Sequence, residues 1–286
     1  MKKSAYWLIG IVVVVVLAGF GIHSISSSQA SNKSHSSSIL IGSEGSDIDI
    51  WQHIAKTDDA KKLGLKIKVK NIADGVQLNK ATADGDVDVN AFQSWSYYLT
   101  YNQQNKANKL TALGTTYLEP MGIYSKKYKN VKDIPAGATI AIANNPSQAA
   151  RGLILLQKAG LITLDKNFGY VGTLKDIKSN PKHFKFRQID DTTGPRIIND
   201  VDAVLISNTV ALEGHLHVLT DSIYHEKVDQ STKDNINILA TSEKNKDNAN
   251  YKKLVKLYHQ KDIQKYIKDK YYGTKIEVNK PLSYLK

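Results

Sequence analysis

The sequence predicts an α/β protein of two lobes, preceded by an N-terminal hydrophobic helix. Strand-like and helix-like segments alternate from residue 39 onward, and a second cycle of the same alternation starts after Pro120. An uncharged apolar run precedes them at residues 5–22. The 286 residues, 41% of them hydrophobic, are enough for one large domain or for two lobes with their own cores.

The N-terminal run predicts that the rest of the chain is exported. Lys2 and Lys3 precede it, and its 18 residues make roughly 27 Å of helix, enough to cross a hydrocarbon core of about 30 Å. We therefore expect residues 1–30 to be an uncleaved membrane anchor with its basic end inside, followed by a Ser-rich tether at 31–38. The alternative is a signal peptide that is cleaved after Ala30, within a small-x-small sequence.

The first cycle of elements predicts a sheet rich in parallel strands, with helices on both faces, because its order is β, α, β, α, β. Residues 65–70 alternate strictly between apolar and lysine, which is typical of a half-buried strand. The expected elements are a strand at 39–41, a helix from 47 to 64, a strand at 65–70, a helix at 76–83 and a strand at 87–89.

The second cycle contains the sharpest helix prediction of the chain. Pro146 suits a first helical turn and Gly160 suits the position after a helix, so we expect a helix at 146–159. The other expected elements are strands at 122–124, 138–143, 184–186 and 203–206, a short helix at 194–199 and a tail helix at 248–272.

The sequence lacks the motifs of an enzyme. It contains no G-x-S-x-G elbow, no G-x-G-x-x-G, no phosphate-binding loop and no H-E-x-x-H. The cysteine count of zero excludes disulfides, thiolate catalysis and Cys-ligated metals. The histidines are scattered. We expect no catalysis, no cofactor and no metal site. The net charge of +12 does not by itself identify a partner, and export makes nucleic acid an unexpected one.

Two groups of residues predict instead a site for a small ligand. Residues 92–98 hold four aromatic side chains, which can form the wall of a pocket or pack into a core. The chain enters the helix expected at 146–159 within residues 143–147, where backbone N–H groups would face a cleft at the carboxyl end of a strand. Arg151 lies one to two turns into this helix. Its guanidinium could hold a carboxylate bidentately, whereas Arg187 and Arg196 are expected in ion pairs.

Four segments resemble the NlpA/MetQ family of substrate-binding proteins, which deliver methionine and related compounds to an ABC importer. The similarity extends over nearly all of residues 39–273. Its most specific parts are Ala83-Asp-Gly-Asp-Val-Asp-Val-Asn-Ala-Phe-Gln93, Glu119-Pro-Met-Gly-Ile-Tyr-Ser-Lys-Lys-Tyr128, Ile134-Pro-x-Gly-Ala-Thr-Ile-Ala-Ile142 and Leu156-x-Lys-Ala-Gly-Leu-Ile162.

The resemblance implies the two-lobed periplasmic-binding-protein-like fold of type II, in which two lobes joined by crossing strands close on a ligand without catalysis. Lobe 1 would comprise residues 39–121 and 236–286, and lobe 2 residues 122–235. Carried over position by position, the family's ligand-binding residues fall on seven positions of this chain. The aromatic wall corresponds to Phe92, Gln93, Tyr97 and Tyr124. The asparagine after a lobe 2 strand corresponds to Asn144, the carboxylate-binding arginine to Arg151 and the amine-binding position to Ser207.

This chain departs from the family pattern at the amine and side-chain end of the ligand. Ser94 stands where methionine binders have His, Ser207 where they have Asn and Val210 where they have Tyr, and the His of the first β-to-α loop is replaced near Ser46. The carboxylate end is retained. Methionine, another amino acid, a modified methionine and a short peptide therefore all remain open.

The expected function is that of an extracytoplasmic binding component of an ABC importer, working with a permease and an ATPase and with the ligand carboxylate on Arg151. We expect a monomer held at the outer face of the membrane by residues 5–22, or released if cleaved after Ala30, because the family's lipid-bearing cysteine is absent. The alternative is a surface adhesion or scaffold protein that kept the fold and lost its ligand.

Overall fold

The structure, a computed structural model, describes residues 38–169 and 172–286. The predicted anchor or signal peptide at 1–30, its cleavage point and nearly all of the tether lie outside these residues. Among the helices that are described, none combines the length and the apolar character needed to cross a membrane.

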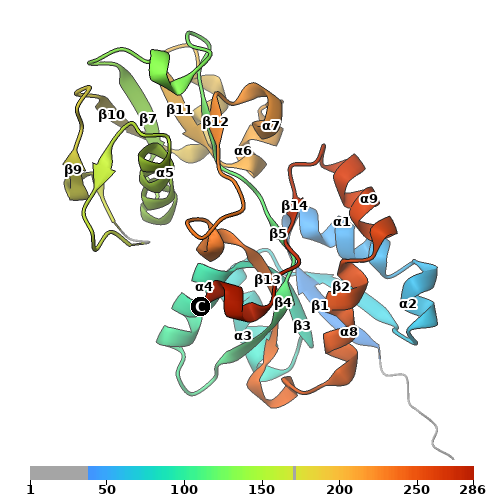
Figure 1. The fold of residues 1–286 in the computed structure, drawn as a ribbon. Coiled ribbons are helices and arrows are strands. Elements are labelled where there is room, and N and C mark those ends of the chain that lie inside the picture. Colours follow the sequence, from blue (N-terminus) through green and yellow to red (C-terminus); the bar gives the residue numbers. More distant parts are fainter. Residues whose placement is uncertain (1–37, 170–171) are drawn as a thin grey trace, which may run out of the picture. The chain divides into compact units, whose positions relative to one another are not determined.

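The first of two five-stranded sheets has the strand order β2-β1-β3-β13-β4 (Figure 1). β1 runs parallel to β2 and β3, and Ile41 is paired with Val69 on one side and Val89 on the other. β13 comes from far along the chain and runs antiparallel to both β3 and β4. The strands are β1 (Ile39–Ser43), β2 (Ile67–Asn71), β3 (Val89–Ser94), β4 (Leu110–Thr115) and β13 (Asn237–Ser242).

The second sheet has the order β10-β7-β11-β6-β12. β7 is parallel to β10 and β11, whereas β6 is antiparallel to β11 and β12. We call each sheet, with the helices that pack on it, the first and second lobe. The second sheet consists of β6 (Gly122–Tyr124), β7 (Thr139–Ala143), β10 (Lys185–Ile189), β11 (Ala203–Ile206) and β12 (Tyr224–His225).

Two short ladders complete the strands. β5 (Tyr117–Leu118) pairs with β14 (Ile276–Glu277), and β8 (Thr163–Leu164) pairs with β9 (Ile177–Ser179). β5 lies in the segment that leads from the first sheet to the second, and residues 226–236 lead back.

Helices cover both faces of the first sheet because its strands alternate apolar side chains between the faces. Leu239 packs in a cluster with Trp51 and Leu254, whereas its neighbours Ile238 and Ala240 belong to a separate cluster. The helices are α1 (Gly45–Ile54), α2 (Asp58–Lys62), α3 (Gly75–Asp84), α4 (Trp95–Gln104), α8 (Ala249–Tyr258) and α9 (Lys261–Lys270).

In the second lobe, α5 (Pro146–Lys158) begins and ends as the sequence predicts. The Asn145 side chain accepts hydrogen bonds from the first N–H groups of the helix, Pro146 occupies its first turn, and Gly160 has a φ of 75°. Leu153 and Leu156 pack on one face of the sheet, while α6 (Asn208–Glu213) packs on the other through Val210 and Ala211, followed by α7 (Val218–Asp221).

Several predicted elements differ in the structure. The helix expected at 47–64 is broken at residues 55–57, because the Thr57 hydroxyl accepts from Ala60 N–H and begins α2. The tail helix expected at 248–272 is likewise two helices, α8 and α9. Residues 191–196 form a 3₁₀ turn that contains Pro195, in place of the helix expected at 194–199. β4 and β13 were not predicted, and antiparallel β13 makes the first sheet mixed.

Candidate functional site

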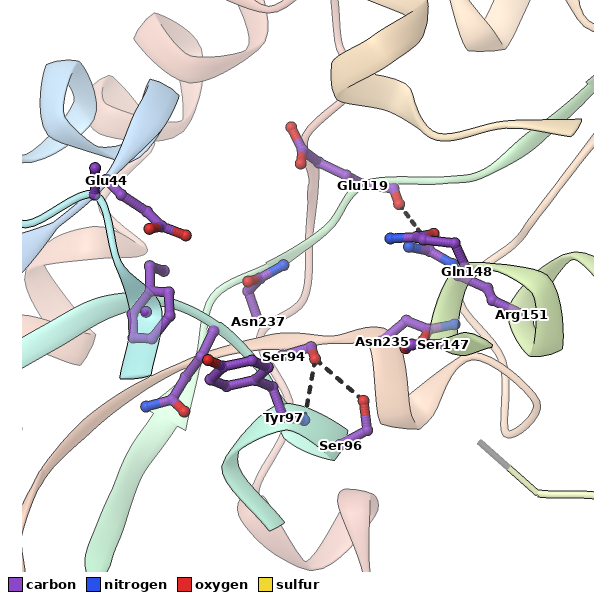
Figure 2. Close-up of a pocket in the computed structure, with 14 residues that line it drawn as sticks. Glu44, Ser94, Ser96, Tyr97, Glu119, Ser147, Gln148, Arg151, Asn235 and Asn237 are labelled. Carbon is purple, nitrogen blue, oxygen red and sulfur yellow. Dashed lines mark hydrogen bonds between the residues drawn. The ribbon is translucent and has the colours of Figure 1, made fainter. Parts of the chain in front are cut away.

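A pocket of about 330 Å³ lies among residues of both lobes, within the usual size range of small-ligand sites (Figure 2). Many of the lining residues lie at or just after the carboxyl ends of β1, β2, β3 and β7, as expected for open α/β sheets. They are Glu44, Ala73, Gly75, Phe92, Gln93, Ser94, Ser96, Tyr97, Glu119, Ser147, Gln148, Arg151, Asn235 and Asn237.

Arg151 lines the pocket from α5, as the sequence predicts, and it is held by a carboxylate that the sequence analysis missed. Its Nε donates to Glu226 Oε1 at 2.9 Å and its Nη2 to Glu226 Oε2 at 2.5 Å. Nη2 also donates to the backbone carbonyl of Glu119 at 2.6 Å. Glu226 is itself held by Met121 N–H and the Asn235 side chain. The guanidinium is therefore fixed in one orientation before any ligand arrives.

This pairing leaves part of Arg151 unused. A guanidinium has five N–H donors, and the three bonds above use Nε and Nη2. Among the described residues, Nη1 makes no hydrogen bond. Burial alone lowers the pKa of Arg151, but the charge and hydrogen bonds of Glu226 outweigh it and the net direction is upward. A permanently charged group thus lines the pocket, and its two Nη1 N–H donors have no partner within residues 38–169 and 172–286.

Two of the predicted aromatic residues form one wall. The rings of Phe92 and Tyr97 meet edge to face with centroids 5.7 Å apart, and Tyr97 is 39% exposed. Gly75 makes room for them, because a Cβ at this position would lie 2.6 Å from Phe92 Cε2. Trp95 and Tyr98 stack on each other in the first lobe, and Trp95 belongs to its core. The aromatic run therefore divides between pocket and core.

Gln93 also lines the pocket, but its carboxamide points into the first lobe. Its Nε2 donates to Asn79 Oδ1 at 2.9 Å and to Asn90 Oδ1 at 2.7 Å, and its Oε1 accepts from Asn79 Nδ2. The residue is only 2% exposed. Because the polar atoms of Gln93 are satisfied in this network, its contribution is to position β3 and the neighbouring Phe92.

The remaining predicted residues are not among those that line this pocket. Tyr124 is fully buried in the core of the second lobe, where its hydroxyl has no hydrogen-bond partner among the described residues. Asn144 is exposed just after β7, and Ser207 precedes α6 without capping it through its side chain. Their roles in binding stay predictions.

Sequence reasoning missed most of the polar lining. Glu44 follows β1, and a search for polar residues at the carboxyl ends of strands would have found it. Gln148 offers a buried side-chain oxygen without a partner in the described structure. Asn235 and Asn237 lie beside and within β13, which had no recognised strand pattern. A buried arginine needs a buried acid, yet nothing local in the sequence identifies Glu226 as that acid.

Close to the pocket lies a buried charge cluster that joins distant parts of the chain. Lys275, 4% exposed, has its Nζ 3.1 Å from Glu119 Oε1, 3.4 Å from Asp47 Oδ1 and 3.9 Å from the Tyr117 ring centroid. Tyr117 donates to Asp47 Oδ2 at 2.6 Å. Asn208 of the second lobe donates to the same Glu119 Oε1. The side chain of Glu119 thus contacts both lobes while its carbonyl holds Arg151.

Burial is the largest single influence on the pKa values within this cluster. It raises the pKa of Asp47, with Lys275 and Tyr117 acting in the opposite direction. Burial also tends to lower the pKa of Lys275, but the negative charges of Asp47 and Glu119 outweigh it, so the pKa of Lys275 is raised. Lys275 is therefore a cation held between two carboxylates. Within residues 38–169 and 172–286, no group of three or more His, Asp or Glu side chains is placed to hold a metal ion.

Comparison with known proteins places the chain in a family. Residues 40–279 match the family model described as NlpA lipoprotein. The chain is 41% identical over 224 residues to the methionine-binding lipoprotein MetQ of Bacillus subtilis, covering 77% of this chain and 80% of that protein.

Solved structures of substrate-binding proteins are similar to this chain as well. A nutrient-binding protein from Burkholderia cenocepacia bound to methionine is 37% identical with a TM-score of 0.69, covering 84% of this chain and 99% of the other. The substrate-binding protein of a methionine transporter from Streptococcus pneumoniae is 34% identical with a TM-score of 0.67, covering 84% and 95%. The chain has the two-lobed fold of substrate-binding proteins and belongs to the NlpA lipoprotein family.

Proposed function

We propose that this protein is the extracytoplasmic binding component of an ABC importer and that it captures methionine, a related amino acid or a short peptide. The single observation that carries the proposal is Arg151, whose guanidinium lines the pocket in a fixed orientation, with no hydrogen bond from Nη1 to any residue that the structure describes. The family and the methionine-binding relatives support it. The ligand carboxylate would accept hydrogen bonds from the two N–H groups of Nη1.

The pairing with Glu226 favours ligand binding and does not compete with it. Glu226 occupies Nε and one edge of Nη2, so a ligand carboxylate at Nη1 need not displace it. Because the side chain of Arg151 is already ordered, binding costs little of the rotamer entropy of about 2 kcal/mol that a free arginine would lose. The start of α5 also lies at the pocket, with Ser147 and Gln148 in the lining. Because Asn145 already accepts from the N–H groups of Ser147 and Gln148, the contribution of the helix is the positive end of its dipole.

The opposite wall suits an apolar or thioether side chain. Phe92 and Tyr97 present ring edges and faces, and a sulfur atom about 5 Å from an aromatic ring is favourable by a few tenths to about 1.5 kcal/mol. Ser94 and Ser96 add small hydroxyl groups to the same wall, and their Oγ atoms are 3.1 Å apart. This combination fits methionine and also other medium-sized side chains.

We further propose residues 39–121 with 236–286 as lobe 1 and 122–235 as lobe 2, which agrees with the sheet to which each main strand belongs. The protein would act as a monomer with a permease and an ATPase. It would be held outside the cell by residues 5–22 or released after cleavage, because the relatives are named as lipoproteins whereas this sequence contains no cysteine.

The proposal is tested by measuring thermal stabilisation of the full chain against L- and D-amino acids, methionine derivatives and dipeptides. A ligand at 100 times its dissociation constant adds about 2.7 kcal/mol to the free energy of unfolding. Arg151→Lys, which keeps the charge but loses the planar fork, should weaken the best ligand about tenfold or more. Arg187→Lys in β10 is the matched control, since Arg187 does not line the pocket.

A flat panel, on protein shown by mass spectrometry to carry no bound ligand, would contradict the proposal and favour the adhesion or scaffold alternative. Equal ligand affinity in Arg151→Lys and in the wild type would contradict the role of Arg151 alone. Chemical turnover of any bound compound would mean that the protein is an enzyme.

A further inference from the structure

Three carboxylates lie close together where the first lobe meets the pocket, and two of them already have structural partners. Asp47 accepts the hydroxyl of Tyr117 and pairs with Lys275. Asp74 caps α3, accepting from Gln77 N–H at 2.9 Å. Glu44 stands at the start of α1, yet its side chain makes no capping bond. In the described chain, its carboxylate makes no hydrogen bond and has no cation within 4 Å.

The charges that line the pocket do not balance without a ligand. The charged lining residues are Glu44, Glu119 and Arg151. Arg151 is balanced by Glu226, whereas Lys275 is shared between Glu119 and Asp47. Among the described residues Glu44 has no such partner, so the pocket and its surroundings carry an excess of negative charge. A ligand that brought only a carboxylate would add to this excess, whereas a zwitterion leaves the total charge unchanged and can place its ammonium group beside Glu44.

We propose that Glu44 binds the protonated amine of the ligand and so selects zwitterions over compounds that lack an ammonium group. The inference rests on the proposed function and assigns the ammonium group of the ligand, which in an α-amino acid is bonded to the same carbon as the carboxylate. Figure 2 shows Glu44 and Arg151 on opposite sides of the pocket, with Tyr97 on the Glu44 side. Aromatic faces such as those of Phe92 and Tyr97 attract ammonium groups as well, which adds to the effect of the carboxylate.

The environment of Glu44 also makes it receptive to a cation. Burial raises the pKa of Glu44, and the negative charges of Asp47 and Asp74 raise it further. Tyr97, whose pKa is raised by burial and then by Glu44 and Asp74, stays a neutral phenol. A bound ammonium would offset the repulsion among these carboxylates. Acidification protonates Glu44 at a higher pH than an ordinary glutamate, so affinity for a zwitterion should fall on acidification before an ordinary glutamate would be protonated.

The test compares two probes on the full chain by isothermal titration calorimetry. The probes are L-methionine and 4-(methylthio)butanoate, which is methionine with its ammonium replaced by hydrogen. We expect the wild type to prefer methionine about tenfold or more, and Glu44→Gln to reduce this preference to about twofold or less. Affinity for 4-(methylthio)butanoate should stay equal or rise in Glu44→Gln, because a repulsive charge is removed. The pH dependence of methionine affinity should disappear in the same variant.

Glu213→Gln is the matched control, since it removes the same charge from an exposed position at the end of α6. It should leave the preference for methionine unchanged. If the panel identifies another zwitterion as the ligand, that compound and its desamino form are the two probes. A wild type that binds no panel compound overturns the proposed function. A wild type that binds, with a preference for the ammonium form that survives in Glu44→Gln, overturns the role of Glu44 alone.

Discussion

Replacing Arg151 by methionine should destabilise the protein as well as weaken ligand binding. Arg151→Met keeps most of the aliphatic stem but leaves Glu226, whose side chain is 5% exposed, without its cation. Breaking one partner of a buried ion pair costs about 3–5 kcal/mol. Glu226 keeps its bonds from Met121 N–H and Asn235, so we expect the lower end, about 3 kcal/mol. For a protein of this size, that loss lowers Tm by about 6–12 °C.

The assay is differential scanning fluorimetry without ligand, supported by urea denaturation to obtain the free energy of unfolding. Arg151→Met combined with Glu226→Gln should recover at least half of the lost stability, because the neutral amide can still accept from Met121 N–H. A fall in Tm of less than about 2 °C in Arg151→Met would refute the reasoning, since it would mean that no buried ion pair was broken.

Two further substitutions test other parts of the site. Lys275→Met should lower the free energy of unfolding by about 3 kcal/mol in urea titrations, because Asp47 and Glu119 would face each other without the cation between them; unchanged stability would contradict the ion pairs. Gly75→Ala should weaken ligand affinity about tenfold in calorimetry, because the new Cβ must push Phe92 out of its position, and affinity equal to the wild type would show that Phe92 forms no essential wall.

Local signals in the sequence account for the elements that were predicted correctly. α5 has a proline in its first turn, an apolar stripe and a glycine after its end, and its start was predicted to the residue. Apolar periodicity continues across residues 55–57 and across 259–260, so each pair of helices was taken for one. A capping threonine decided the first break, and such a cap competes only weakly with periodicity in a sequence pattern.

Single residues of the pocket could be predicted from the sequence, whereas interactions between residues far apart in the sequence could not. Phe92, Tyr97 and Arg151 line the pocket, and their residue types and positions near strand ends are informative by themselves. Glu226 lies 75 residues from Arg151 in the sequence, and only the tertiary fold brings them together. Tyr124 was expected in the wall from its family motif. β6 places its side chain in the core of the second lobe, and its role in binding stays a prediction.

The position of β13 in the first sheet has a consequence for how the chain is made. β13 lies between β3 and β4, yet it begins at residue 237, more than 120 residues after β4 ends. During synthesis from the N-terminus, β3 and β4 cannot pair with β13 until residues 237–242 have been made. The strands of the second sheet come from one uninterrupted stretch of the chain, so that sheet can form earlier. Completion of the first sheet is therefore a late event that requires nearly the whole chain. In the nascent chain, β4 and one edge of β3 therefore lack the partner that they have in the complete sheet, which exposes them to aggregation.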